Sequence, residues 1–502
     1  MAEIKELDQI INRKNKIEQY KELGIDPFGQ KFSVSAHSKD IYDNYSYLVK
    51  QHDENNNEEQ ICEDKTETLA GRIVLLRKMG KASFFNILDK TGKIQCYIRM
   101  DVVGEDNYKI FKMADLGDIV GVEGHIMVTK TGTLTLRVLK FTHLTKALRP
   151  LPDKFHGLQD IEIRSRKRYL DLIVNEDSMK VAFARPKIIR GIQKFLDNRG
   201  YVEVETPVLS PILGGASARP FITHHNTLDR DFYLRIATEL SLKRLLVGGM
   251  ERVYEIGRLF RNEGMDTTHN PEFTTVELYE AYGDLQSMME INEELFRTLA
   301  KEVRGTTKIE WNGNVIDLEP EFKKATMADL VKEKTGIDFV AIKSDEEAIK
   351  LAKEHDIYVE KHWTYGHVLN AFFEKYVEES LVQPTFVMGH PIEISPLTKK
   401  DPKDPRFTLR FELYIGTKEF SNAYTELNDP IDQKQRFENQ LKERDKGNAE
   451  ANDMDEDFLE ALEYGMPPAG GMGIGIDRLV MFLTSTSSIR EVILFPTLKT
   501  LK

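Results

Sequence analysis

Cysteine is scarce in this chain, and long apolar runs and an excess of positive charge are missing. Its 502 residues include only Cys62 and Cys96, so the sequence predicts neither a disulfide framework nor a cysteine-based zinc site. No apolar run approaches the roughly 20 residues of a membrane-spanning helix. The first residues, MAEIKELDQIINRKNKIEQY, lack the apolar segment of a secretion signal. A net charge of -12 gives no global attraction to nucleic acid, although a local basic face would suffice. We expect a soluble protein of the reducing cytoplasm.

The first 178 residues divide into three predicted parts. Residues 1–65 form an N-terminal extension that starts with an amphipathic helix over residues 1–24 and ends in a polar loop over residues 50–65. Five short alternating strands separated by glycine-containing turns occupy residues 66–147 and predict a small closed barrel of the OB type. Residues 148–178 are interpreted as a linker.

Residues 179–502 mix helical and strand patterns. ARPKIIRGIQKFLDNRG has apolar residues at helical spacing, and the following YVEVETPVL alternates like a strand. Residues 310–380 are predicted to be a mainly helical insertion. Because strands follow one another in sequence, an antiparallel sheet is favoured over a doubly wound parallel one. The predicted fold class is mixed α/β (α+β): a five-stranded barrel, then a domain built on an antiparallel sheet flanked by helices.

One loop between two predicted strands, FRNEGMDTTHNPEFTTVELY, concentrates charged and aromatic side chains. Alternation places Arg261 and Glu263 on one face of the first strand, and Phe273, Glu277 and Tyr279 on one face of the second. Such a face is a poor core but suits a charged, planar ligand, because arginine binds phosphate and phenylalanine can stack on a base. The alternative is a solvated hairpin whose charges pair with one another.

A second segment, RFELYIGTKEF, contains two carboxylates. A tight turn at Ile415 and Gly416 would place Glu412 and Glu419 directly opposite each other on one face, where they repel. A hard divalent cation would offset this repulsion, and Mg²⁺ is favoured if phosphates are present because it seldom has an all-protein cage. A shared proton, or a register shift that separates the carboxylates, is the alternative.

The third segment is glycine-rich, PPAGGMGIGIDRLVMFL. Gly471, Gly473 and Gly475 alternate along a predicted strand, so a flat ligand could lie against its bare backbone. Asp477 is predicted to cap the following helix, which puts Arg478 in the first helical turn. A cation there is unfavourable unless an anion binds. The spacing is not a dinucleotide fingerprint, and a packing role for the glycines is the alternative.

Further polar residues do not suit a phosphate site. Glu239 in IATELSLKRLL, with Asn422 and Glu426 after Glu419, would bring acids toward the same place. They fit a second ligand that carries two ammonium groups. Ordinary surface acids are the alternative.

Together these segments resemble the class II aminoacyl-tRNA synthetases, and among them the bacterial lysyl-tRNA synthetase family. FRNE and HNPEFT are similar to motif 2 of that class, GGMGIGIDRL to motif 3, and the helix with YVEVETP, including Pro207, to motif 1. The lysine-type character lies in HGLQDIEIRSRKRYLDLI, GGASARPFITHHN, HPIEISPL and EALEYGMPPAGGMGIGIDRL. The resemblance runs from residue 66 to the C-terminus and is weak over the first sixty residues.

The resemblance implies a ligase that activates L-lysine with ATP to lysyl-adenylate, releases pyrophosphate and transfers lysine to the 3′ end of tRNA(Lys). The implied ATP-binding residues are Arg261, Glu263, His269, Phe273, Glu412 and Arg478, of which Arg261 and Arg478 would be catalytic. The implied lysine-binding residues are Gly215, Glu239, Glu277, Tyr279, Asn422 and Glu426. Glu412 and Glu419 would hold Mg²⁺, and motif 1 implies a homodimer.

The barrel would then read the tRNA anticodon, because OB folds stack unpaired bases on aromatic side chains. The resemblance assigns this contact to Arg77, Phe84 and Gln95, while one of the adjacent Phe84 and Phe85 is expected in the core. Thr133 stands where relatives often carry an acid, so no contact is assigned there. A basic run between the domains either touches tRNA or forms an exposed helix face; its members are Arg164, Arg166, Lys167 and Arg168.

Two other functions are weighed against this one. An aspartyl- or asparaginyl-tRNA synthetase shares the barrel and all three motifs, but its site needs a cation where this chain offers Glu239, Glu277 and Glu426. A catalytically silent synthetase-like scaffold would not need the intact Arg261 and Arg478. The sequence therefore favours a lysine-activating enzyme.

Overall fold

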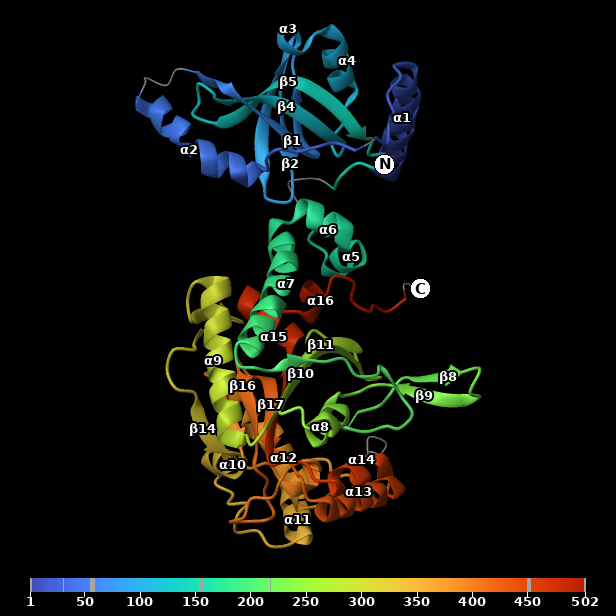
Figure 1. The fold of residues 1–502 in the computed structure, drawn as a ribbon, viewed down its shortest axis with the longest axis vertical. Helices are drawn as coiled ribbons and strands as arrows, with labels where there is room; N and C mark the ends of the chain where they lie inside the picture. Colours follow the sequence, from blue (N-terminus) through green and yellow to red (C-terminus); the bar gives the residue numbers. More distant parts are fainter. Residues whose placement is uncertain are drawn as a thin grey trace. The chain divides into compact units, whose positions relative to one another are not determined.

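The structure is a computed structural model that describes residues 2–29, 31–54, 59–152, 158–216, 218–448 and 453–500. Its contacts divide the chain into two compact units, Met1–Gly157 and Leu158–Lys502 (Figure 1). Within the described ranges, no helix is long and apolar enough to cross a membrane.

The first unit is a closed five-stranded barrel with strand order β1-β2-β3-β5-β4. Its interior is filled by alternate strand residues such as Leu69, Phe85 and Ile98, all of which are fully buried. The strands are β1 (Gln60–Lys78), β2 (Ala82–Leu88), β3 (Lys93–Arg99), β4 (Ile119–Val128) and β5 (Leu134–Thr145), and the helices are α1 (Ala2–Glu22), α2 (Ser38–Glu54), α3 (Met100–Val103) and α4 (Glu105–Met113). The predicted OB-type barrel is confirmed.

The N-terminal extension packs on the barrel of its own unit. The predicted first helix corresponds to α1, in which Tyr20 stacks on His143 at 4.1 Å between ring centroids. Arg13 donates hydrogen bonds to the carbonyls of Ala147 and Arg149. The predicted polar loop at 50–65 is partly wrong, because α2 continues to Glu54 and β1 starts at Gln60; residues 55–58 lie outside the described ranges.

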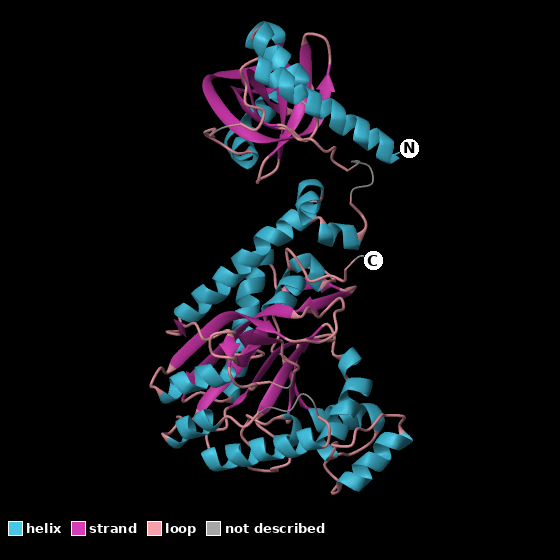
Figure 2. Cartoon of the chain, turned by 90° about the vertical axis from the view of Figure 1, so that its right-hand side faces the viewer, coloured by secondary structure: helices cyan, strands magenta, loops and turns pink. Residues whose placement is uncertain are grey.

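The second unit is built on an eight-stranded sheet of order β14-β15-β16-β17-β18-β11-β10-β6. Figure 2 shows the strands of this unit with helices around them. Its central pairs are antiparallel, and the edge pairs β14–β15 and β10–β6 are parallel. The sheet strands are β6 (Val202–Glu203), β10 (Arg252–Phe260), β11 (Glu272–Ala281), β14 (Lys323–Thr326), β15 (Thr385–Met388), β16 (Arg410–Ile415), β17 (Lys418–Thr425) and β18 (Ala469–Gly475). The predicted antiparallel sheet flanked by helices is confirmed.

The two faces of this sheet differ, and the difference positions the site. On one face, Leu278 and Ile474 pack against α7 (Glu176–Asp197), α9 (Leu285–Arg304) and α15 (Ile476–Thr484) in the largest apolar core. Because side chains alternate along a strand, the neighbours Glu277 and Tyr279 point to the opposite face, beside α8 (Glu239–Val247). Glu277 and Tyr279 therefore lie on the face opposite the largest apolar core.

Smaller elements complete the unit. Residues 310–380 hold three helices, but they also contain a hairpin strand and an edge strand of the large sheet. The alternation pattern of the sequence did not distinguish these short strands from the helices. The segment YVEVETPVL is not one strand: only the two residues of β6 pair with β10, and Pro207 separates them from the next short strand. The remaining elements are α5 (Ile161–Arg166), α6 (Arg168–Val174), β7 (Leu209–Ser210), β8 (Ile222–His225), β9 (Arg230–Leu234), β12 (Lys308–Trp311), β13 (Asn314–Asp317), α10 (Met327–Thr335), α11 (Asp345–Glu354), α12 (Tyr365–Tyr376), α13 (Pro430–Asp445), α14 (Glu456–Glu463) and α16 (Ile489–Val492), with 3-10 turns at Glu378–Ser380 and Ile392–Ile394.

Candidate active site

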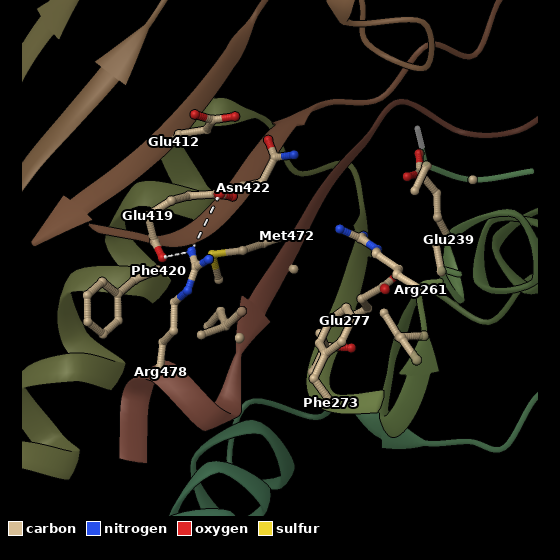
Figure 3. A pocket seen from close by; sticks show the side chains of 18 of the residues that line it. Glu239, Arg261, Phe273, Glu277, Glu412, Glu419, Phe420, Asn422, Met472 and Arg478 are labelled. Carbon is tan, nitrogen blue, oxygen red and sulfur yellow. Dashed lines mark hydrogen bonds and ion pairs between the residues drawn. The ribbon is translucent and has the colours of Figure 1, made fainter. Parts of the chain in front are cut away.

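A cavity of about 490 Å³ lies over the polar face of the sheet, within the size range of small-molecule sites (Figure 3). Strand pairing sets its floor in rows: Glu277 lies opposite Gly473, which lies opposite Asn422, which lies opposite Glu412. The lining includes Gly215, Glu239, Arg261, Glu263, His269, Phe273, Glu277, Tyr279, Glu412, Glu419, Asn422 and Arg478. Every residue expected at the ATP, lysine and metal sites thus lines this one cavity, except Glu426.

Arg261 presents its charge to the cavity. It follows β10, and its guanidinium group lies 5.2 Å from the centre of the Phe273 ring on β11. Its buried Nε has no hydrogen-bond partner among the described residues. Figure 3 shows the guanidinium group pointing into the open space. A buried donor left without a partner is costly, so this arrangement suits an anionic ligand.

The loop between β10 and β11 is held by Asp266 rather than by Arg261. Asp266 accepts hydrogen bonds from the backbone of Thr268 and His269, and from His269 Nδ1 at 2.8 Å. These bonds outweigh partial burial and hold the pKa of Asp266 well below its usual range. The alternative interpretation, in which the charges of this loop pair with one another, therefore holds for Asp266 and His269. It does not hold for Arg261, whose guanidinium group faces the cavity.

Arg478 enters from the opposite wall, in the first turn of α15. Its Nη1 donates to the backbone carbonyl of Glu419 at 2.7 Å, and its Nη2 lies 3.1 Å from His269 Nε2. The predicted cap at Asp477 is wrong: Gly475 is the N-cap. Asp477 instead accepts a hydrogen bond from the Thr274 amide and pairs with Arg185 at 2.6 Å, which ties α15 to β11 and α7.

Glu412 and Glu419 share a face of the β16–β17 hairpin. The prediction that they lie directly opposite each other is wrong. Glu412 pairs with Asn422, and Glu419 pairs with Tyr414. The ladder shifts register after Leu413, so that Phe420 becomes an extra residue that packs into the core. This bulge returns Glu419 to the face of Glu412, and both carboxylates line the cavity.

The two carboxylates differ in charge state. Burial raises the pKa of Glu412, but His390 and Arg410 outweigh it and hold that pKa well below its usual range. Burial and the charge of Glu412 raise the pKa of Glu419 to about 7. The expected repulsion is therefore present, and a cation would relieve it. No group of three or more metal-ligating side chains occurs among the described residues, so phosphate or water would supply the other ligands of such an ion.

At the other end of the cavity, acids and tyrosines are packed together. The Tyr424 hydroxyl donates to Glu239 Oε2 at 2.6 Å, and the Thr238 amide donates to Glu277 Oε1 at 3.3 Å. Burial, then the nearby charge of Glu239, raises the pKa of Glu277 to about 7. This end of the cavity favours a cationic group.

Glu426 lies behind this end rather than in its lining. It is fully buried and forms an ion pair with the fully buried Lys243, whose Nζ also lies 2.6 Å from Glu239 Oε1. Lys243 was not predicted from the sequence, although its position four residues after Glu239 on a helix is a usable signal. Arg410 was not predicted either, and its guanidinium donates to both Glu412 and Asn422.

The glycines of β18 have different roles. A Cβ on Gly471 would overlap Glu426 Oε1 and lie 2.5 Å from the Tyr279 ring, so this glycine is needed for packing. A Cβ on Gly473 would meet Glu277 at an ordinary 3.6 Å, and one on Gly475 would meet nothing within 4 Å. Gly473 and Gly475 therefore form the bare floor of the cavity, and Gly471 fits the packing alternative.

The barrel presents an aromatic surface of its own. Phe84 is half-buried and stacks on Tyr97 with 4.5 Å between ring centroids, whereas Phe85 is fully buried in the core. Arg77 pairs with Phe84 across β1 and β2, and Gln95 Oε1 accepts a hydrogen bond from Thr135 at 2.9 Å. These side chains lie on adjoining outer strand positions.

The basic run that precedes the second domain is mostly bound within its own unit. Arg168 is buried and pairs with Asp171 at 2.5 Å, Arg164 pairs with Asp171 at 2.8 Å, and Arg166 pairs with Glu162. The Arg164–Asp171 pair joins α5 to α6, and Arg168 Nε also donates to the carbonyl of Leu494.

Comparison with known proteins places the chain in a family. A model described as tRNA synthetases class II (D, K and N) matches residues 160–499, and one described as an OB-fold nucleic acid binding domain matches residues 67–144. Lysine–tRNA ligases of Staphylococcus aureus (strain MRSA252) and Staphylococcus epidermidis are each 56% identical to the chain over 492 residues, which cover 97% of this chain and 98% of each relative. The chain belongs to the class II tRNA synthetases, within the lysine–tRNA ligase family.

Proposed function

We propose that this protein activates L-lysine with ATP and transfers it to tRNA(Lys). The observation that carries the proposal is that one cavity is lined by both cationic and acidic side chains. Arg261 and Arg478 offer cations, and Glu239 and Glu277 offer buried carboxylates. An aspartate or asparagine substrate would need a cation where this chain has buried acids, so lysine is the amino acid that fits.

ATP would be held by side chains from both walls. Arg261 would bind the α-phosphate, His269 and Arg478 the other phosphates, Phe273 the adenine ring and Glu263 the adenine amino group. The support for Arg261 is its unpartnered Nε beside the Phe273 ring. Figure 3 supports Arg478, which projects from α15 toward Glu419.

Glu412 and Glu419 fit a magnesium ion, because both carboxylates line the cavity from one face of the hairpin and the charge of Glu412 raises the pKa of Glu419, a repulsion that a cation would relieve. When bound, the ion would neutralise charge on the ATP phosphates. Arg410 orients Glu412 by donating a 2.7 Å hydrogen bond to its Oε1.

Lysine would lie over the acid end. Gly215 and Glu239 would meet its α-amino group, Asn422 its carboxylate, and Tyr279, Glu277 and Glu426 its ε-ammonium. All of these except Glu426 line the cavity, and Glu426 lies directly behind Tyr279 and Gly471. Glu239 and Glu426 share one cation, Lys243, so a neutral substrate side chain would leave buried negative charge uncompensated, which gives strong discrimination.

The chemistry needs no general base in its first step, because the lysine carboxylate is already an anion. One of its oxygens attacks the α-phosphorus, pyrophosphate leaves, and a terminal tRNA hydroxyl then attacks the carbonyl carbon and releases AMP. Arg261 and Arg478 would stabilise the negative charge that spreads over the phosphate oxygens, and the rows of the sheet would fix the two substrates at reacting distance.

We also propose how the rest of the chain serves this reaction. Residues 66–147 would read the anticodon through Arg77, Phe84 and Gln95, and residues 179–502 would form the catalytic domain, with residues 1–65 as an extension and 148–178 as a linker. A homodimer would form through motif 1, where Phe183, Val202 and Leu209 leave apolar surface exposed. The cytoplasm, where tRNA is charged, is the proposed location.

Pyrophosphate exchange into ATP, measured with each of the twenty amino acids in turn, tests the proposal. We expect lysine alone to stimulate strong exchange. Stronger exchange with aspartate or asparagine, or none with lysine, would contradict it.

A further inference from the structure

Lys243 is a buried cation that the proposed reaction does not use. We propose that Lys243 is a specificity-determining positioning residue, whose ammonium group holds Glu239 and Glu426 in the arrangement that selects a substrate with a terminal ammonium group. This inference rests on the proposed function and assigns a further residue to the same site.

The contacts of Lys243 connect it to both acids. It lies on α8, its side chain is fully buried, and its Nζ is 2.6 Å from Glu239 Oε1 and ion-paired with Glu426. The Leu397 carbonyl lies 3.4 Å from the same nitrogen, and the centre of the Tyr424 ring lies 5.5 Å from it. One ammonium group thus links an acid that lines the cavity with an acid behind it.

Tyr424 extends this linkage to the cavity surface. Its hydroxyl donates to the second oxygen of Glu239 at 2.6 Å, so both oxygens of that carboxylate are engaged. Lys243 and Tyr424 therefore fix the orientation of Glu239, and any ligand contact with Glu239 depends on Lys243.

When all three carboxylates at this end are ionised, counting Lys243 makes their net charge match the two ammonium groups of lysine. Three carboxylates, on Glu239, Glu277 and Glu426, carry -3 when ionised, and Lys243 adds +1, which leaves -2. The α-ammonium and ε-ammonium groups of lysine together carry +2. Without Lys243 the three carboxylates would exceed the charge of the substrate.

The surroundings show what would happen to the acids without Lys243. The titratable groups in contact with this ammonium are Glu239 on α8, Tyr424 on β17 and Glu426 directly after β17. Glu277 and Tyr279 on β11 lie close enough to interact with the same acids. Burial raises the pKa of Glu426, and the ion pair with Lys243 opposes that rise. Removal of the cation would raise the pKa of Glu426 further and leave Glu239 without its ion pair, so the pocket would distinguish an ammonium from a methyl group less well.

The test compares lysine with norleucine, which has the same chain without the terminal amine. Pyrophosphate exchange gives kcat/KM for both amino acids between pH 6.5 and 8.5. The preference is kcat/KM for lysine divided by kcat/KM for norleucine, and this ratio largely removes the titration of the α-amino group, which both amino acids carry. The variants are Lys243→Met, Lys243→Arg and, as a matched control, Lys350→Met, an exposed lysine on α11. Thermal melting reports whether each variant folds.

We expect Lys243→Met to lower the preference for lysine over norleucine at least tenfold at pH 7, with partial recovery as pH rises and the acids ionise. The KM for ATP should change less than twofold, Lys243→Arg should retain part of the preference, and Lys350→Met should behave like the parent. An unchanged preference, or an equal loss for lysine, norleucine and ATP, would overturn the inference.

If Lys243→Met does not fold, Lys243→Gln carries the same comparison, because it keeps a hydrogen-bond donor and removes the charge. A preference in Lys243→Gln equal to that of the parent would likewise overturn the inference. Failure of the parent protein itself to use lysine would instead contradict the proposed function.

Discussion

Replacing Gly471 with alanine should harm both the stability of the protein and its use of lysine. The new methyl group would overlap Glu426 Oε1 and lie 2.5 Å from the Tyr279 ring, and both of those residues are buried. Overpacking of this kind costs about 1–3 kcal/mol. In a domain of this size that corresponds to a fall in melting temperature of about 1–4 °C. Because Tyr279 lines the cavity, its displacement should also raise the KM for lysine more than the KM for ATP.

Gly473→Ala is the matched control, since it lies two residues further on the same face of β18. Its methyl group would meet Glu277 at 3.6 Å, so the melting temperature without ligand should stay within about 1 °C of the parent. That methyl group would nevertheless occupy the floor of the cavity and weaken substrate binding. Differential scanning fluorimetry and exchange kinetics measure both effects. Equal melting temperatures for Gly471→Ala and the parent would refute the packing role of Gly471.

Three other changes test separate parts of the site. Glu426→Gln should raise the KM for lysine by about tenfold and leave the KM for ATP nearly unchanged, because it removes a carboxylate from the ammonium end alone; equal losses in exchange kinetics would contradict the assignment. Phe84→Ala should weaken charging of tRNA but spare pyrophosphate exchange, because the ring that stacks on Tyr97 lies in the barrel; a parallel fall in exchange would show that the barrel is not a separate reader. The stability of the ligand-free protein should fall as pH rises from about 4.5 to 7, because Glu277 keeps its proton to about pH 7 when folded and loses it near 4.5 when unfolded. That difference in pKa corresponds to about 3 kcal/mol of unfolding free energy, and Glu277→Gln should remove this part of the pH dependence. Denaturation curves at pH 5 and 7 that show the same pH dependence for the parent and for Glu277→Gln would exclude Glu277 as the cause.

Much of the architecture follows from local patterns. The alternation of apolar residues predicted the barrel, and the succession of strands predicted an antiparallel sheet; both are confirmed by the fold. The family assignment is confirmed as well, because its motifs are continuous segments of sequence. The residue roles at the site stay predictions that the proposed experiments test.

Non-local geometry is the part that the sequence could not show. The bulge at Phe420 decides which face Glu419 occupies, and it depends on how that ring packs between the sheet and α9 rather than on the hairpin sequence. Alternation likewise could not reveal that Lys243 meets an acid far along the chain, because the pairing of α8 with the end of β17 is a tertiary contact. Glycine spacing suggested one role for the whole of β18, while contacts separate Gly471 from Gly473.

Charging of a tRNA(Lys) transcript by the purified protein tests the central claim most directly. With ATP, magnesium and labelled lysine, we expect lysine bound to the 3′ end and one AMP released for each lysine attached. A transcript with a substituted anticodon should be charged more slowly. No attachment of lysine, or faster attachment of aspartate to its own tRNA, would contradict the proposed function.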